Sequence, residues 1–104
     1  GHYARLPQYQ IVEEDLRIFS RKNTEFHALI MAPNTNIIDD WRQRVKKSLS
    51  DLQEQIEICS FAYMMRNYQK YAQKKYNYIV VDDERVIIRT KLEKPSKIKG
   101  LALI

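Results

Sequence analysis

The fold is decided by residues 37–76, whose sequence is IIDDWRQRVKKSLSDLQEQIEICSFAYMMRNYQKYAQKKY, a stretch of about forty residues without glycine or proline. Apolar residues recur in it at spacings of three and four, which is the period of one buried face of an α-helix. They are Ile38, Trp41, Val45, Leu49, Leu52, Ile56, Cys59 and Tyr63. The flanking sequences are shorter and resemble strands, so we expect a few strands packed on a central helical segment.

The start of this helical segment is well marked. Asn34-Thr35-Asn36 supplies capping residues, and Thr35 or Asn36 can accept the unpaired N–H groups of the first turn. Asp39 and Asp40 fall in that first turn, where negative charge interacts favourably with the helix dipole. We therefore expect the helix to begin at about residue 37.

The apolar stripe changes direction near Cys59-Ser60. Downstream it passes through Phe61, Met65, Tyr68, Ala72 and Tyr76. A single helix over the whole segment would be about 60 Å long, which is far beyond the size of a domain of this length. We therefore favour two helices within residues 37–75, the second one capped by Ser60, and keep one long helix as the alternative.

Alternating apolar residues predict β-structure before the helical segment. Residues 16–20 and 26–31 alternate on either side of a polar turn, which predicts an N-terminal β-hairpin, with a helix over residues 13–21 as the alternative. We expect residues 3–14 to form an extended arm because Pro7 is incompatible with a helix interior.

A second hairpin is predicted after the helical segment. Residues 78–81 and 86–92 are rich in β-branched side chains and flank an acidic turn, so we expect a C-terminal β-hairpin over residues 78–92. The predicted fold class is α+β, with an N-terminal hairpin, one or two central helices and a C-terminal hairpin. The predicted core consists of Ile18, Phe26, Leu29, Ile38, Trp41, Val45, Leu49, Leu52, Ile56, Phe61, Met65, Tyr68, Ile79, Val81 and Ile87.

Length and composition indicate one domain. The chain has 104 residues, of which 44% are hydrophobic, enough for one modest core over residues 3–104. Gly1-His2 resembles the remnant of an expression tag. No apolar run is long enough to span a membrane, so we expect no integral membrane association. The single cysteine, Cys59, cannot form an internal disulfide and fits an intracellular location, cytoplasmic or nuclear.

The sequence lacks the residue sets that common catalytic and metal sites need. His27 is the only histidine outside Gly1-His2 and has no partner at metal-ligand spacing. Pairs of acids fall at the ends of predicted elements, where they serve as caps and turn residues. No glycine lies between Gly1 and Gly100, which excludes a glycine-rich phosphate loop. We expect a protein that is not an enzyme and that uses no cofactor or metal.

The strongest functional signal is a basic, acid-free stretch. Residues 58–81 contain no Asp or Glu, in a chain of net charge +5. Arg66, Lys70 and Lys74 are spaced so as to line one helix face, among amides and tyrosines that suit phosphate contacts and the reading of base edges. The candidate nucleic-acid-binding residues are Arg66, Asn67, Gln69, Lys70, Gln73, Lys74, Lys75, Arg85, Arg89 and Lys91.

The order helix, helix, hairpin over residues 37–92 resembles a winged helix-turn-helix DNA-binding domain. The resemblance rests on element order and charge. It implies that residues 61–75 are the recognition helix and that the hairpin at residues 78–92 is the wing. The implied function is non-enzymatic binding of double-stranded DNA through the candidate residues.

A second resemblance covers residues 26–41. The segment FHALIMAPNTNIIDDW resembles the last strand and the helix start of a pleckstrin-homology domain, with Phe26, Leu29, Met31 and Trp41 at the matching positions. It implies the alternative function, a module that docks a protein or an anionic membrane and has no nucleic-acid role. In either case the leftover apolar surface of a long helix favours homodimerisation.

Overall fold

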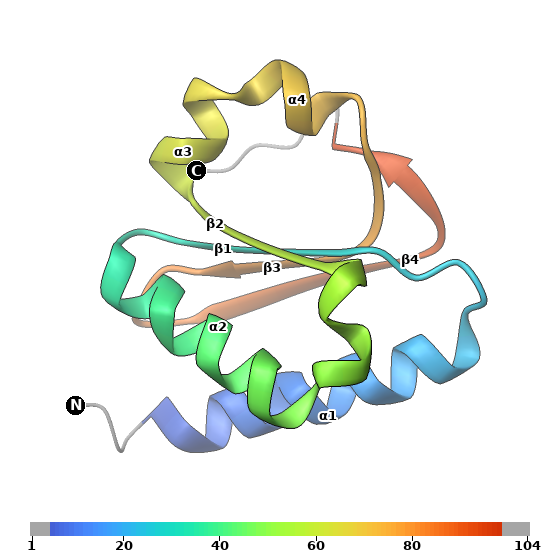
Figure 1. Ribbon diagram of the computed structural model, residues 1–104, viewed down its shortest axis with the longest axis horizontal. Coiled ribbons are helices and arrows are strands. Elements are labelled where there is room, and N and C mark those ends of the chain that lie inside the picture. The colour runs from blue at the N-terminus through green and yellow to red at the C-terminus, as the bar shows by residue number, and fades with distance from the viewer. Residues whose placement is uncertain (1–4, 99–104) are drawn as a thin grey trace.

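The computed structural model describes residues 5–98 and shows a four-stranded sheet with helices on both faces (Figure 1). The predicted tag remnant, Gly1-His2, lies outside these residues. Helices and strands are interspersed along the chain. The elements are α1 (Leu6–Lys22), β1 (Ala28–Ala32), α2 (Thr35–Ser48), the 3₁₀ segment η2 (Ser50–Gln55), β2 (Ile56–Ser60), α3 (Phe61–Arg66), α4 (Tyr68–Ala72), β3 (Lys75–Asp82) and β4 (Ile87–Lys97).

The sheet has the strand order β2-β1-β3-β4. β1 runs parallel to both of its neighbours, so that Ala28 lies opposite Ile56 on one side and Tyr78 on the other. β3 and β4 are antiparallel, with an irregularity in the pairing between Tyr76 and Tyr78. All five residues of β1 are buried, as expected for a parallel strand that is covered on both faces.

Successive residues of β1 point to opposite faces of the sheet and so contribute to two separate cores. Ala28, Ile30 and Ala32 pack in the core between the sheet and the helices α1 and α2. Leu29 and Met31 pack in the smaller core between the sheet and the helices α3 and α4. The molecule therefore has three layers, with α1 and α2 below the sheet and α3 and α4 above it in Figure 1.

The N-terminal segment is a helix and not the predicted hairpin. Tyr9, Val12 and Leu16, at spacings of three and four, are the buried residues of α1. Pro7 lies in the first turn, where its missing N–H has no intrahelical partner to lose. Residues 16–20 also alternate in polarity, and that shorter pattern predicted a strand. The helix forms because its buried stripe also runs through the preceding segment, which was expected to be an extended arm. The alternative considered for residues 13–21, a helix, is therefore correct.

Helix α2 begins at Thr35, about two residues before the predicted start, so its first turn contains no acidic residue and the expectation for Asp39 and Asp40 is wrong. The side chain of Asn34 caps the helix by accepting a hydrogen bond from the Ile37 backbone N–H at 3.0 Å, whereas the sequence favoured Thr35 or Asn36. Trp41 and Val45 are buried on the inner face, and the helix ends at Ser48.

The prediction of helix for the second half of residues 37–75 is wrong, and so is the predicted fold class. Ile56 and Cys59 continue the helical spacing from Leu52, but residues 56–60 form the strand β2, in which Ile56 and Ile58 pack on one face of the sheet and Cys59 packs on the other. The helix predicted for residues 61–75 is interrupted at Asn67, which leaves α3 with six residues and α4 with five. The β3–β4 pair belongs to a mixed sheet, so the winged-helix-like arrangement is wrong too. The long helix that favoured homodimerisation does not exist.

Most of the predicted core is buried, with informative exceptions. Ile18, Met65 and Tyr68 are exposed because α1, α3 and α4 turn other faces to the sheet. Leu52, Phe61, Val81 and Ile87 pack at the margins of the two cores and are partly buried. The remaining members are buried: Phe26, Leu29, Ile38, Trp41, Val45, Leu49, Ile56 and Ile79.

A buried carboxylate ties the end of β3 to two helices on one face. Asp82 is fully buried and accepts a hydrogen bond from Trp41 Nε1 at 2.9 Å. It also pairs with the Arg5 guanidinium, and this hydrogen bond raises the pKa of Arg5. A buried charge is costly unless it is paired and hydrogen-bonded, so these contacts fix the start of α1 and the middle of α2 against the sheet.

The helical state of the N-terminal segment can be tested with two neighbouring residues. Leu16 is fully buried and Ile18 is 42% exposed. Leu16→Ala should lower the free energy of unfolding by about 2–5 kcal/mol through cavity formation. Ile18→Ala should change it by less than about 0.5 kcal/mol. Urea unfolding followed by circular dichroism gives both values, and equal losses would contradict the observed orientation of α1.

Candidate functional site

A cavity of about 400 Å³ opens beyond the end of β2. The chain leaves β1 to form α2 on one face of the sheet and leaves β2 to form α3 and α4 on the other. A crevice at the carboxyl ends of adjacent parallel strands whose connections diverge in this way is the usual ligand position in such sheets. The cavity is lined by Thr35, Ile38, Arg42, Ile58, Cys59, Ser60, Tyr63, Arg66 and Tyr71.

The turn from β2 into α3 positions the upper wall of the cavity. Ser60 ends the strand and caps the helix, its Oγ accepting a hydrogen bond from the Tyr63 backbone N–H at 3.0 Å. Tyr63 and Arg66 are three residues apart in the same helix, so their side chains lie on the same side of it. The sequence expectation that Ser60 caps a helix is confirmed.

Two guanidinium groups line the cavity. Arg42, on α2, pairs with Asp39 at 3.6 Å, but both side chains are at least 60% exposed, so water weakens the pair. Arg66 has no ion-pair partner among the residues that the structure describes. Both cations are therefore available to an anionic ligand.

Aromatic rings and a third cation lie beside these two. The rings of Tyr63 and Tyr71 meet edge to face, with centroids 6.2 Å apart. The ammonium group of Lys70 lies 5.8 Å from the Tyr63 centroid and 5.5 Å from that of Tyr71. Tyr63 is 40% exposed while Tyr71 is buried, so Tyr63 presents part of its ring to solvent next to the positive charge.

The inner wall of the cavity is uncharged. Burial raises the pKa of the Cys59 thiol and also that of the Tyr71 hydroxyl. Both groups are therefore neutral near pH 7, and Cys59 is not an activated thiolate. The charge at this cavity comes from the cations alone.

A partly buried hydrogen-bond cluster anchors the loop that follows α4. Glu57 of β2 accepts hydrogen bonds from Lys74 Nζ at 2.7 Å and from the Tyr76 hydroxyl at 2.9 Å, and its carboxylate lies 2.7 Å from His27 Nε2. Burial opposes ionisation of Glu57, but the hydrogen bonds from Lys74 and Tyr76 outweigh it and lower its pKa. Lys74 is thus paired with Glu57, and its side chain is only partly exposed.

The structure divides the sequence-predicted site residues into separate groups. Arg66 and Lys70 lie at or beside the cavity. The Asn67 side chain is occupied in ending α3, since its amide donates to the Tyr63 carbonyl at 2.8 Å. Gln69 and Gln73 are exposed, in α4 and at its end.

The remaining predicted residues lie elsewhere. Lys75 begins β3 at the opposite end of the parallel strands. Arg85 lies in the turn before β4, while Arg89 and Lys91 lie on β4 and pair with Asp15 of α1 at 3.1 and 3.2 Å. The row of basic residues expected on one helix face is therefore not formed.

Sequence reasoning missed the contribution of α2. Arg42 and Thr35 line the cavity, yet they precede the acid-free stretch and belong to a helix with mixed charges on its surface. The available signal was the alternation of Ile56 and Ile58 with the polar residues Gln55 and Glu57. If that strand had been recognised, its pairing with β1 would have predicted that the ends of the two strands lie together and that Arg42 lies close to Arg66.

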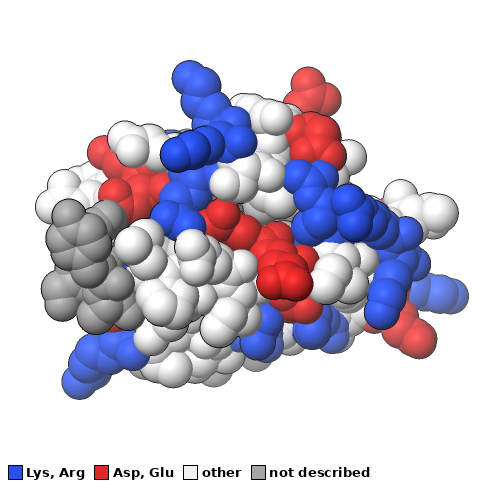
Figure 2. Space-filling view, turned by 90° about the horizontal axis from the view of Figure 1, so that it is seen from below, with Lys and Arg blue, Asp and Glu red and all other residues white. Residues whose placement is uncertain are grey.

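Charge on the face formed by α1 and α2 is mixed. Seen from that side, basic and acidic side chains are interspersed (Figure 2). Within residues 5–98 no cluster of three or more His, Cys, Asp or Glu side chains could hold a metal ion. None of the helices in that part of the chain has the length and apolar character needed to cross a membrane.

Comparisons of the chain with models of protein families, with curated proteins and with solved structures gave no match.

The role of Glu57 can be tested by its effect on acid stability. Its pKa is lower in the folded protein than in the unfolded chain, so its contribution is complete above about pH 4.5 and is lost as the pH falls through the folded value. Glu57→Gln should therefore show a smaller fall in unfolding free energy than the wild type between about pH 6 and 3. Urea unfolding at a series of pH values measures this.

Glu54→Gln is the matched control for this experiment. Glu54 is an exposed acid of η2, and its removal should leave the acid-dependent loss of stability unchanged. Identical pH profiles for Glu57→Gln and the wild type would contradict the assigned role of Glu57.

Proposed function

We propose that the protein is a non-enzymatic, single-stranded nucleic-acid-binding protein that uses the surface formed by α2, the end of β2 and α3. The observation that carries the proposal is the cavity lined by the guanidinium groups of Arg42 and Arg66, with the exposed ring of Tyr63 in its wall. Charge for phosphates and rings for bases are the two requirements of single-strand binding.

Phosphate groups would contact a track of cations along α2 and α3. A second cavity, of about 310 Å³, shares Arg42 and Ile58 with the first and includes Lys46, one helical turn further along α2. Arg66, Arg42 and Lys46 thus follow one another along the two cavities. The hydroxyls of Thr35 and Ser60 and the positive end of the α2 dipole add favourable interactions with phosphate oxygens.

The lengths of α3 and α4 favour a single strand over a duplex. A recognition helix reads bases along the major groove of a duplex, but a helix of six residues is only about 9 Å long. Tyr63 and Tyr68 are 40% and 38% exposed, and unpaired bases can stack on such rings without a helix entering a groove. These features favour single-stranded DNA or RNA as the proposed ligand over the duplex expected from the sequence.

A double charge reversal tests the phosphate track. Arg42→Glu with Arg66→Glu should weaken binding of a fluorescein-labelled single-stranded oligonucleotide by more than about tenfold at about 50 mM salt, measured by fluorescence anisotropy. Because two phosphate contacts are lost, the slope of log K against log salt should become shallower by about 1.4.

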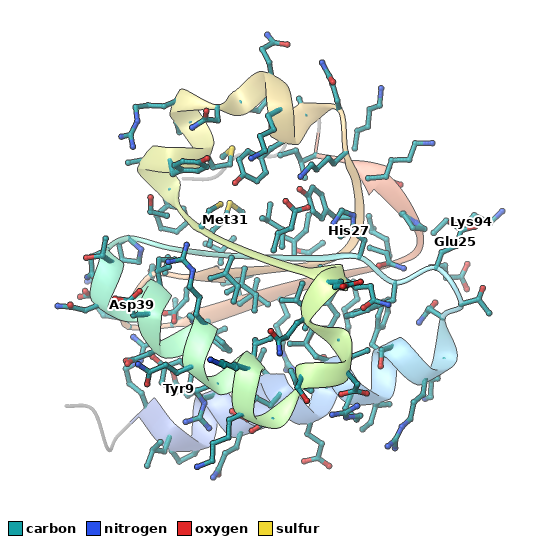
Figure 3. The ribbon with its side chains drawn as sticks, viewed as in Figure 1. Tyr9, Glu25, His27, Met31, Asp39 and Lys94 are labelled. Atoms are coloured by element: carbon teal, nitrogen blue, oxygen red, sulfur yellow. The ribbon has the colours of Figure 1, made fainter. Side chains whose placement is uncertain are left out.

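The matched control changes the charge by the same amount at the opposite end of the molecule. Lys22→Glu with Lys94→Glu changes the net charge of +5 by the same four units, and Lys94 lies far from Asp39 at the start of α2 (Figure 3). This control should retain most of the affinity. Equal losses in the two variants would contradict a localised site, and preferential binding to anionic lipid vesicles would favour the membrane-docking alternative.

Substitution of Tyr63 tests base stacking separately from charge. Tyr63→Ala should cost about 1–3 kcal/mol of binding free energy, while Tyr63→Phe, which keeps the ring, should bind almost as tightly as the wild type. Competition with the matching duplex completes the experiment. A duplex that competes as well as the single strand, together with no loss in Tyr63→Ala, would refute single-strand binding.

A further inference from the structure

Among the residues that the structure describes, the outermost strand β4 has an open edge. It spans eleven residues, lies at the end of the sheet and is exposed over most of its length. Within residues 5–98 its only strand neighbour is β3. An edge of this kind presents unpaired backbone N–H and C=O groups to any strand that can reach it.

The hydrogen-bond pattern identifies which backbone groups face outward. In an antiparallel pair, hydrogen-bonded and non-hydrogen-bonded residue pairs alternate. Asp83 N–H donates to the Val86 carbonyl at 3.1 Å, so the register makes Ile88 and Thr90 the next residues of β4 that bond to β3. The intervening residues Ile87, Arg89 and Lys91 therefore direct their N–H and C=O groups to the open edge.

The two faces of this edge differ in chemistry. On the face toward α1, Arg89 and Lys91 share the single carboxylate of Asp15, and their side chains are 35% and 44% exposed. One positive charge is therefore left in excess. On the other face, Ile88 is 53% exposed and Leu92 is 38% exposed.

We propose that residues 87–92 bind an extended segment of a partner protein in which acidic and apolar side chains alternate. The segment would pair with the open edge as a fifth strand, which is the β-augmentation mode of peptide recognition. Its alternate side chains would point to opposite faces. Acidic ones would meet Arg89 and Lys91, and apolar ones would cover Ile88 and Leu92.

Charge argues against a second copy of the chain as the occupant. Antiparallel pairing of two β4 strands would bring the Arg89 and Lys91 rows of both copies together, and like charges across a strand pair are destabilising. Further along β4, Lys94, Pro95 and Lys97 are residues that protect strand edges from pairing. This confines the site to residues 87–92, on the edge of the sheet opposite β2 and away from the proposed nucleic-acid surface.

The proposal is tested with a labelled peptide of eight residues that alternates Glu and Val. The full chain should bind it, as measured by fluorescence anisotropy, and should not bind the Lys-Val peptide of equal length. N-methylation of the backbone amides on one edge of the Glu-Val peptide should weaken binding by about tenfold, the value of one to two net hydrogen bonds. Equal binding of all three peptides would overturn the proposal.

Two substitutions of Arg89 separate backbone pairing from charge. Arg89→Ala keeps the outward N–H and should weaken binding only a few-fold. Arg89→Pro also removes that donor, at an edge position where proline is tolerated, and should weaken binding at least about tenfold. Circular dichroism establishes that each variant is folded. Equal affinity in both variants would contradict strand addition.

Amide hydrogen exchange of the unsubstituted protein provides a test that needs no variant. Addition of the Glu-Val peptide should slow exchange at Ile87, Arg89 and Lys91, and unchanged exchange there would overturn the proposal. Arg42→Glu with Arg66→Glu should bind the peptide like the wild type, so the result does not depend on the nucleic-acid proposal. Self-association blocked by Arg89→Pro would instead identify a second copy as the occupant and refute the proposal.

Discussion

The burial of β1 on both faces is the constraint on which the rest of the structure depends. A strand of five apolar residues with parallel neighbours on both sides must be covered above and below. The chain meets this requirement by placing α2 on one face between β1 and β2, and α3 with α4 on the other face before β3. The divergence of these two connections creates the cavity between Arg42 and Arg66, so the candidate site is a direct result of covering β1.

Sequence patterns predicted the part of the fold that local physics controls. The capping residues before the helix and the stripe through Trp41 and Val45 predicted α2 without reference to any other segment, although the cap is Asn34 and not Thr35 or Asn36. β2 escaped prediction because Ile56 continues the helical spacing, and its strand state is stabilised by pairing with β1. A short apolar segment can fit both the helical and the strand period. Its structure is then decided by the segments that it packs against, which a local sequence pattern does not reveal.

The same distinction explains how much of the candidate site could be predicted. The absence of acids over residues 58–81 pointed to Arg66 and Lys70, because charge composition is a property of the sequence alone. The contribution of Arg42 depends on how the chain returns from β2, which only the sheet topology determines. Lys74 was indistinguishable from Lys70 in the sequence, although its hydrogen bond to Glu57 gives it a structural role.

The register of β1 has a consequence for how the protein folds during synthesis. Ala28 pairs with Ile56 on one side and with Tyr78 on the other. Its second partner is therefore synthesised fifty residues after Ala28 itself. Contacts between such distant residues slow folding because a long loop must be closed before they form. One edge of the most apolar strand therefore stays unpaired until nearly the whole domain has left the ribosome. Completion of the sheet is a late event, and chaperone binding to the nascent chain would be most useful in that interval.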